Sequence, residues 1–147
     1  MWKIAEQLQT AITMLSAIAA RTSPQNAAVI RDRVSSRYVS PGRDGALWER
    51  LIDVVSIQNA DAWRWIAEYE GDHPGILFFN PEDESAMFEF THRRDVVAVL
   101  AECTGFEFYL TDVEATFLLC FNHHDFMIAA GDARTWLLSQ RSSRSSD

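Results

Sequence analysis

Apolar residues recur every three or four positions in the first half of the chain, which is the spacing of one face of an α-helix. The first series predicts a helix over about residues 2–20. Ser23-Pro24 is a helix-start signal and predicts a second helix that ends before residues 40–42. Similar spacing predicts helices over about 46–57 and, after a possible Asn59 cap, 60–69. The apolar positions of these helices are Ile4, Leu8, Ile12, Leu15, Ile18, Ala27, Ile30, Val34, Leu47, Leu51, Val54, Val55, Trp63, Ile66 and Tyr69.

The pattern changes in the second half to short runs rich in aromatic and β-branched residues, which are typical of β-strands. Segments 76–79 and 86–90 flank a Pro-Glu-Asp-Glu turn and predict a hairpin. Segments 106–111 and 125–130 alternate in polarity, whereas 116–121 is almost entirely apolar, as expected for a strand buried on both faces. A helix between Thr91 and Gly105 and a short helix after Gly131 complete the pattern.

These elements predict an α+β fold, in which N-terminal helices precede an antiparallel sheet of about five strands with a helix inserted and a C-terminal helix. We expect the helices to cover one face of the sheet. The prediction is a single domain over residues 1–139, with a helical part at 1–70 and a sheet part at 71–139. Residues 140–147 are expected to form a polar tail.

The charge along the chain changes the picture of its partners. The 147 residues carry a net charge of −8, so nucleic acid is not an expected partner. Residues 44–132 contain 18 acidic and 4 basic residues, a net charge of −14, whereas residues 21–43 contain 5 Arg and 1 Asp. A strongly acidic body of this kind favours a basic protein partner.

The cysteine content and the first 20 residues bear on the compartment. Cys103 and Cys120 lie in apolar runs and are expected to be buried free thiols, which suits a reducing cytosol. Glu6, Gln7 and Gln9 interrupt the apolar segment that a signal peptide would need. No apolar run is long enough to cross a membrane, so the sequence predicts a cytoplasmic protein with no membrane partner.

The segment Asn122-His123-His124-Asp125 carries the residues most suited to chemistry. His123, His124 and Asp125 are the alternative set for a metal site, but no further ligand stands at a recognised spacing. A histidine beside an aspartate can act as an oriented base, yet no nucleophile motif accompanies it. The preferred interpretation is a hairpin tip whose Asn and Asp side chains bond turn amides, and which is also placed to contact a partner.

Acidic residues in two turns extend this candidate partner-binding surface. Glu82, Asp83 and Glu84 lie in the predicted hairpin loop, and Glu70 and Asp72 lie in the turn before the first strand of that hairpin. The alternative is a solvated loop. Trp63 and Trp65 point to different sides of a helix, so one of them is expected at the surface. Arg31, Arg33 and Arg37 are expected to form a solvated helix face that pairs with the acidic body.

A resemblance to known proteins rests on a set of positions within residues 76–138. They are Phe108-Tyr109-Leu110, the run from Leu118 to Asp125, Ala130-Gly131 and Trp136-Leu137. This set resembles a small uncharacterised bacterial protein family, and it is loosely similar to the SUKH superfamily of immunity proteins. The resemblance implies a single α+β domain that binds a partner protein, often a toxin, without catalysis.

The sequence therefore favours a non-enzymatic protein-binding domain, of immunity or antitoxin type, that neutralises a basic partner without a cofactor. Its candidate binding residues are Glu70, Asp72, Glu82, Asp83, Glu84, His123, His124 and Asp125. The alternative is a small His/Asp metal-dependent enzyme centred on the hairpin tip. A third possibility is a homodimer, or a larger assembly of identical chains, in which Ile4, Leu8, Leu15 and Ile18 pack on a second copy.

Overall fold

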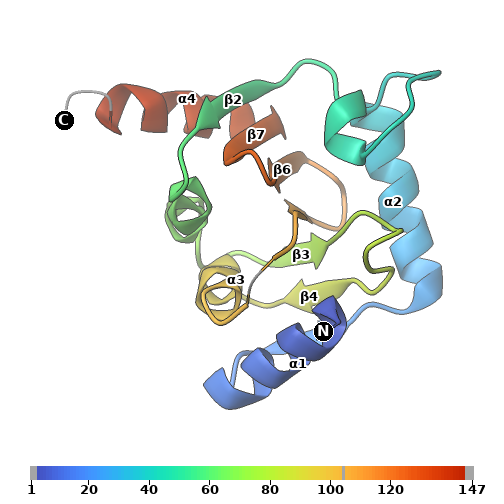
Figure 1. Ribbon diagram of the computed structural model, residues 1–147, viewed down its shortest axis with the longest axis vertical. Helices are drawn as coiled ribbons and strands as arrows, with labels where there is room; N and C mark the ends of the chain where they lie inside the picture. The colour runs from blue at the N-terminus through green and yellow to red at the C-terminus, as the bar shows by residue number, and fades with distance from the viewer. Residues whose placement is uncertain (1–2, 104, 145–147) are drawn as a thin grey trace.

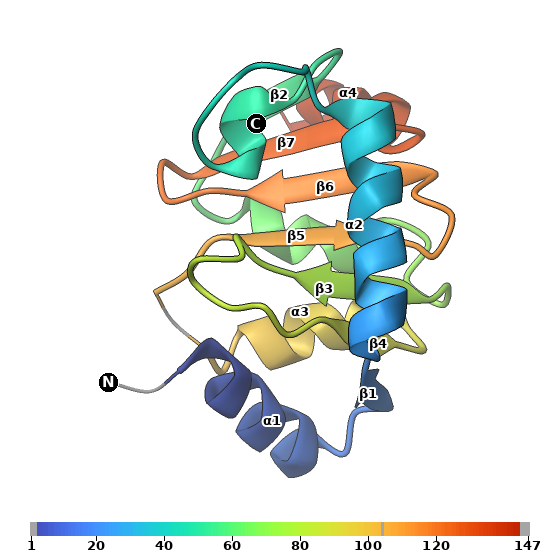
Figure 2. The same cartoon turned by 90° about the vertical axis from the view of Figure 1, so that its right-hand side faces the viewer.

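Seven strands form one antiparallel sheet in the order β1-β4-β3-β5-β6-β7-β2, seen face-on in Figure 2. The structure is a computed structural model that describes residues 3–103 and 105–144. The strands are β1 (Ala19–Arg21), β2 (Val55–Gln58), β3 (Gly75–Phe78), β4 (Phe88–Phe90), β5 (Phe108–Thr111), β6 (Phe117–Phe121) and β7 (Phe126–Gly131). The α+β class and the hairpin formed by β3 and β4 are confirmed.

Helices lie on both faces of the sheet, so the expectation of a single covered face was wrong. Figure 1 shows α2 on one side of the strands and α3, with the C-terminal helix α4, on the other. The helices are α1 (Ile4–Leu15), α2 (Pro24–Tyr38), α3 (Arg93–Leu100) and α4 (Ala133–Arg144), with 3-10 helices η1 (Leu47–Arg50) and η2 (Ala62–Glu68). Because β3 and β5 are buried along their whole length, both faces of the sheet need a cover.

Two separate apolar clusters fill the space between the layers. Leu77, Leu110 and Leu119 point toward α1, α3, α4 and η2, and Ile76, Tyr109 and Leu118 point toward α2 and η1. The alternation follows from the pleat of a strand, in which successive side chains face opposite sides. Burying a large apolar side chain contributes about 1.5–3 kcal/mol, so these two clusters stabilise the three-layer arrangement.

The two strands missing from the sequence prediction come from the first half of the chain and form the sheet's edges. The predicted first helix ends earlier, at Leu15, because Ser16 adopts a left-handed conformation with φ of 53°. The chain then continues into β1, which pairs with β4. The predicted helix over 46–57 was wrong, since only Leu47–Arg50 is helical and Val55–Gln58 pairs with β7.

Two further predictions concern the start of α2 and the C-terminal segment. Ser23 caps α2 as predicted, because its hydroxyl accepts a hydrogen bond from the Asn26 N–H at 3.2 Å. Residues 140–144, expected within a polar tail, continue α4 to Arg144, which is ion-paired with Glu68. Residues 145–147 of that tail lie outside the described residues. Over the described part of the chain, every helix is too short or too polar to cross a membrane.

Because neighbouring strands are antiparallel, the loops fall into two groups, one at each end of the sheet. β3 ends, β5 begins and β6 ends at the same side, because β5 is antiparallel to both of its neighbours. The loop of residues 79–87, the segment 105–107 and the turn of residues 122–125 therefore meet at one end. The segment 70–74, which precedes β3, lies at the other end. This sorting decides which candidate residues share a site.

Candidate functional site

The tip between β6 and β7 is a tight turn organised by Asn122, which is 3% exposed. Its Oδ1 accepts hydrogen bonds from the backbone N–H groups of His124 at 3.0 Å and Phe126 at 3.1 Å. The Asp125 backbone has a φ of 63°, and its N–H donates to the Asn122 carbonyl. The predicted hairpin tip and the role of the Asn122 side chain are confirmed.

His123 forms the main polar contact of this tip with Glu107. Its Nδ1 lies 2.5 Å from Glu107 Oε2, and its backbone N–H donates to the same oxygen at 2.9 Å. The imidazole is 64% exposed, whereas the Glu107 side chain is only 12% exposed. The pair therefore joins a sheltered carboxylate to a solvent-facing ring.

Glu107 is held by a second set of donors on its other oxygen. The Trp48 indole N–H and the Asn80 amide each donate to Oε1 at 3.0 Å. The pKa of Glu107 is below its ordinary value of 4.5: burial alone would raise it, but hydrogen bonds from His123, Trp48 and Asn80 favour the ionised form and outweigh burial. Glu107 is therefore a fixed negative charge at neutral pH.

Tyr109 completes the network beneath Glu107. Its hydroxyl donates to Asn80 Oδ1 at 2.6 Å and accepts a hydrogen bond from the Trp48 backbone N–H at 3.1 Å. Burial raises the pKa of Tyr109, so the phenol stays protonated. The network connects η1, β5 and the loop after β3, and it holds Glu107 in one position.

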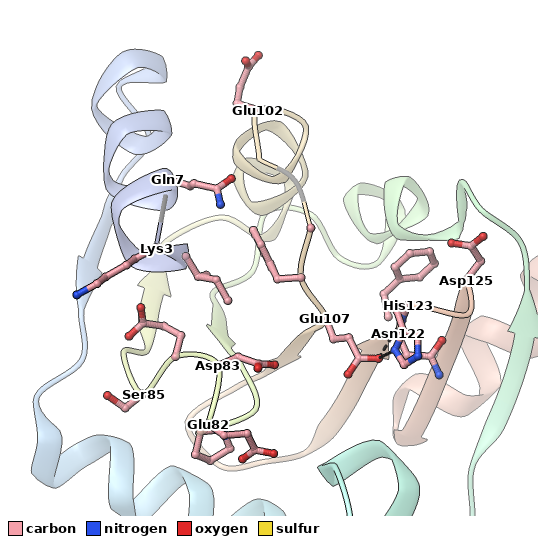
Figure 3. A pocket seen from close by; sticks show the side chains of 16 residues that line it. Lys3, Gln7, Glu82, Asp83, Ser85, Glu102, Glu107, Asn122, His123 and Asp125 are labelled. Carbon is pink, nitrogen blue, oxygen red and sulfur yellow. Dashed lines mark hydrogen bonds and ion pairs between the residues drawn. The ribbon is translucent and has the colours of Figure 1, made fainter. Parts of the chain in front are cut away.

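Trp48 also packs against the two histidines. Its ring meets His123 at a centroid distance of 6.1 Å and His124 at 5.9 Å, both edge to face. The two imidazoles lie 3.9 Å apart. His124 is exposed on the η1 side of the tip, and Figure 3 shows the Asp125 carboxylate directed away from His123. Of the alternative metal set, the two histidines therefore lie together against Trp48, whereas the Asp125 side chain is directed away from His123.

A wide groove opens at this end of the sheet, with Glu107 in its wall (Figure 3). Its volume of about 1530 Å³ exceeds the 300–1,000 Å³ typical of small-molecule sites, so it suits a polypeptide segment better. The lining residues are Lys3, Ile4, Gln7, Pro81, Glu82, Asp83, Glu84, Ser85, Glu102, Gly105, Phe106, Glu107, Phe121, Asn122, His123 and Asp125.

The charges of this groove are unbalanced. Of the described residues that line it, six are acidic and Lys3 is the one lysine or arginine. Figure 3 shows the Lys3 side chain pointing outward, away from Glu107, while Asp83 lies between them. One carboxylate oxygen of Glu84 already accepts a hydrogen bond, from the N–H of Ala5 at 3.1 Å in the first turn of α1. Glu82, Asp83 and Glu102 are exposed to solvent.

The structure thus brings together only part of the predicted binding surface. Glu82, Asp83, Glu84, His123 and Asp125 line the groove, and His124 lies beside it. Glu70 and Asp72 lie at the opposite end of β3.

Those two carboxylates have neighbours of their own. Glu70 is ion-paired with Arg93 at 3.4 Å and with His73 at 3.3 Å, and Asp72 is ion-paired with Arg94. The acidic residues therefore form two surfaces rather than one.

The geometry also bears on metal binding. Within residues 3–103 and 105–144, no group of three or more His, Cys, Asp and Glu side chains is arranged to hold a metal ion. His123 Nδ1 is already bonded to Glu107, so one nitrogen of the alternative set is occupied. The arrangement is better suited to presenting negative charge.

Glu107, Trp48, Asn80 and Tyr109 were not identified from the sequence. A usable signal existed for Glu107, because β5 and β6 were both predicted and are adjacent along the chain. Pairing of Phe108 with Phe121 places Glu107 beside the tip. No comparable pattern marks Trp48, which reaches the site from the irregular segment around η1.

Other sequence predictions concerned side chains outside the tip. Trp65 is buried and Trp63 is only partly buried, so one tryptophan of the pair does reach the surface. Arg33 is ion-paired with Glu114 at 3.9 Å, as expected for a helix face that meets the acidic body.

Comparison with models of known protein families, with curated proteins and with solved structures found no match. The similarity to SUKH-superfamily proteins stays a prediction from the sequence.

Proposed function

We propose that this chain is a non-enzymatic, cytoplasmic protein-binding domain that receives a basic segment of a partner protein in the groove at the Glu107 end of the sheet. The observation that carries this proposal is the excess of acidic residues in the groove: its described lining holds six acidic residues and one lysine or arginine, Lys3. Charge of one sign in a concave surface attracts an oppositely charged partner and speeds its association.

The rigidity of the groove supports the same proposal. Glu107 is fixed by four hydrogen bonds and stays ionised, so it adds a negative charge at a fixed position in the groove wall. A preorganised site loses less conformational entropy on binding. A role of immunity or antitoxin type, in which a basic toxin is neutralised, fits these features.

The two acidic surfaces allow a matched experiment. The probe is a fluorescein-labelled peptide of seven alternating Lys and Arg residues, and binding is measured by fluorescence anisotropy at low and high salt. The groove variant Glu82→Gln/Asp83→Asn removes two charges, and the control Glu70→Gln/Asp72→Asn removes two at the opposite end of β3. Circular dichroism checks that both variants are folded.

We expect the groove variant to bind about tenfold more weakly than the wild type, and the control to change by less than about twofold. Binding of the wild type is expected to weaken as salt rises, because salt screens exposed charges. Equal losses in both variants would show that the groove has no special role, and absence of binding would contradict the proposal.

One observation favours a second candidate, a histidine-dependent enzyme. His123 and Glu107 form a carboxylate-imidazole pair at the edge of an open groove, a geometry that can orient a general base. If the chain acts in this way, His123→Gln removes a measurable hydrolytic activity toward a panel of ester and phosphoester substrates while His124→Gln retains it. A lack of turnover by the wild type on that panel would leave the binding proposal preferred.

A further inference from the structure

An apolar pocket lies next to the acidic groove on the η2 and α3 side of the sheet. Gly105, Phe106 and Phe121 line both of them, so the two spaces are adjacent. The pocket is completed by Trp63, Leu100, Cys103 and Phe108. Among the described residues that line it there is no charged side chain, in contrast to the groove beside it.

The walls of this pocket belong to the core and are held in place. Leu100 and Phe108 are buried, and Trp63, Cys103, Phe106 and Phe121 pack against the same cluster. Burial raises the pKa of the Cys103 thiol to about 11, with a smaller contribution from the nearby charge of Glu102. Cys103 is therefore an uncharged wall at neutral pH.

The size of the pocket suits one side chain. Its volume of about 160 Å³ is close to the ~150 Å³ of an apolar protein cavity that holds a benzene ring. A Leu, Phe or Met side chain is of this order, whereas a whole peptide segment fits only the larger groove. The two spaces thus differ in both size and polarity.

The charges around the pocket favour a basic chain carrying that side chain. Glu102 and Glu107 flank the shared residues Gly105 and Phe106 in sequence and line the groove. The nearest basic residue on η2 is Arg64, whose guanidinium lies 4.3 Å from the Trp63 ring centroid. It is already ion-paired with Asp61 at 3.9 Å. If a partner places an apolar side chain in the pocket, its neighbouring residues on the groove side would therefore face these carboxylates.

We propose that the pocket formed by Trp63, Phe106 and Phe121 receives one large apolar side chain of a partner peptide whose neighbouring Lys or Arg residues occupy the acidic groove. The inference rests on the proposed function and specifies its partner as a mixed basic and apolar segment. A peptide made only of basic residues would occupy the groove and leave the pocket empty. The combination of an aromatic pocket and a charged rim is typical of protein-binding hot spots.

Two peptides test the pocket separately from the groove. Both are fluorescein-labelled with the sequence Lys-Arg-Lys-X-Lys-Arg-Lys, where X is Leu in one and Ser in the other. The wild type is expected to bind the Leu peptide about tenfold more tightly, because burying a Leu side chain stabilises the complex. Trp63 emission is expected to shift with the Leu peptide only, and Trp63→Phe identifies its contribution.

A filled pocket is the matched variant. Cys103→Phe places a ring in the pocket and leaves every groove carboxylate unchanged, so it is expected to bind both peptides with the affinity that the wild type has for the Ser peptide. Val99→Leu, a fully buried position in the same core cluster, is the packing control and is expected to keep the preference for Leu. Because the wild type alone compares the two peptides, the test does not depend on how the variant folds.

The outcomes separate the two proposals. Equal affinity of the wild type for both peptides would overturn the pocket assignment and leave the acidic groove intact. Absence of binding to either peptide would overturn both. Dimerisation of the unliganded wild type that Cys103→Phe abolishes would assign the pocket to a second copy of the chain and overturn the basic-peptide assignment.

Discussion

Glu107 is the residue on which the candidate site depends. Four hydrogen bonds from Trp48, Asn80 and His123 converge on its two oxygens. Hydrogen bonds to a charged acceptor are worth about 1.5–3 kcal/mol each in favourable cases, and they couple three separate segments here. Glu107 thus has a structural role in addition to its charge in the groove.

Replacing Glu107 by Gln is expected to lower the free energy of unfolding by about 1–3 kcal/mol at pH 7. The folded-state pKa of Glu107 lies below the ordinary value of 4.5, so its ionised form contributes stability above pH 4.5. That contribution is lost as the pH falls through the folded-state pKa. The difference between wild type and Glu107→Gln is therefore expected to shrink below pH 4.5.

Urea unfolding at a series of pH values measures this difference. Glu102→Gln is the control, because Glu102 lines the same groove but is exposed. It is expected to leave the stability within about 0.5 kcal/mol of the wild type. A pH-independent loss in Glu107→Gln would contradict the role of its charge.

At the scale of elements, the backbone at the junction between β7 and α4 packs closely against the residue that precedes β6. Gly131 has a φ of 65°, and a Cβ atom there would lie 2.6 Å from the Thr116 carbonyl oxygen. That oxygen also accepts the N–H of Asp132 at 3.0 Å, so it cannot move freely. The turn therefore requires glycine for both its conformation and its space.

Gly131→Ala is expected to lower the free energy of unfolding by about 3 kcal/mol. Gly42→Ala is the matched control, because Gly42 also has a positive φ, of 82°, but nothing lies within 4 Å of its Cβ position. The control isolates the cost of the left-handed backbone, about 1 kcal/mol. Thermal and urea denaturation measure both variants, and equal losses would show that the close contact costs nothing.

At the scale of the whole molecule, the sheet ends in two edge strands, β1 and β2. Unpaired edges invite pairing with another chain. The β2 edge is covered by the C-terminal helix, because the Arg141 guanidinium donates to the Ser56 carbonyl at 2.6 Å. On α1, Leu8 packs in the domain's own core, whereas Leu15 is exposed, and so is Ile18 in the segment between α1 and β1. Homodimer formation through α1 stays a prediction.

Arg141→Ala is expected to promote self-association, because it leaves the Ser56 carbonyl without its partner on the open edge. Sedimentation velocity over a tenfold range of concentration is the measurement. Arg43→Ala, in an exposed loop, removes the same charge without touching the sheet. If Arg141→Ala and Arg43→Ala sediment alike, the arginine has no protective role at this edge.

Much of the fold followed from the sequence, because periodicity and turn chemistry act locally. The strands around residues 108–131 were identified from their apolar alternation, and Asn122-His123-His124-Asp125 was identified as a tip from its residue types. Ser23-Pro24 marked the start of α2 in the same way. Each of these features depends on neighbours only a few positions away.

Tertiary structure alone decided the rest. β1 and β2 are strands because β4 and β7 offer them an edge, although their own sequences fit a helix or no regular element. The two predicted strands β5 and β6 gave a signal for Glu107 near the tip, but the packing of η1, which brings Trp48 to Glu107, had none. Glu107 bonds to His123, 16 positions away, and to Trp48, 59 positions away. Such contacts depend on how the chain folds back, which local patterns do not encode.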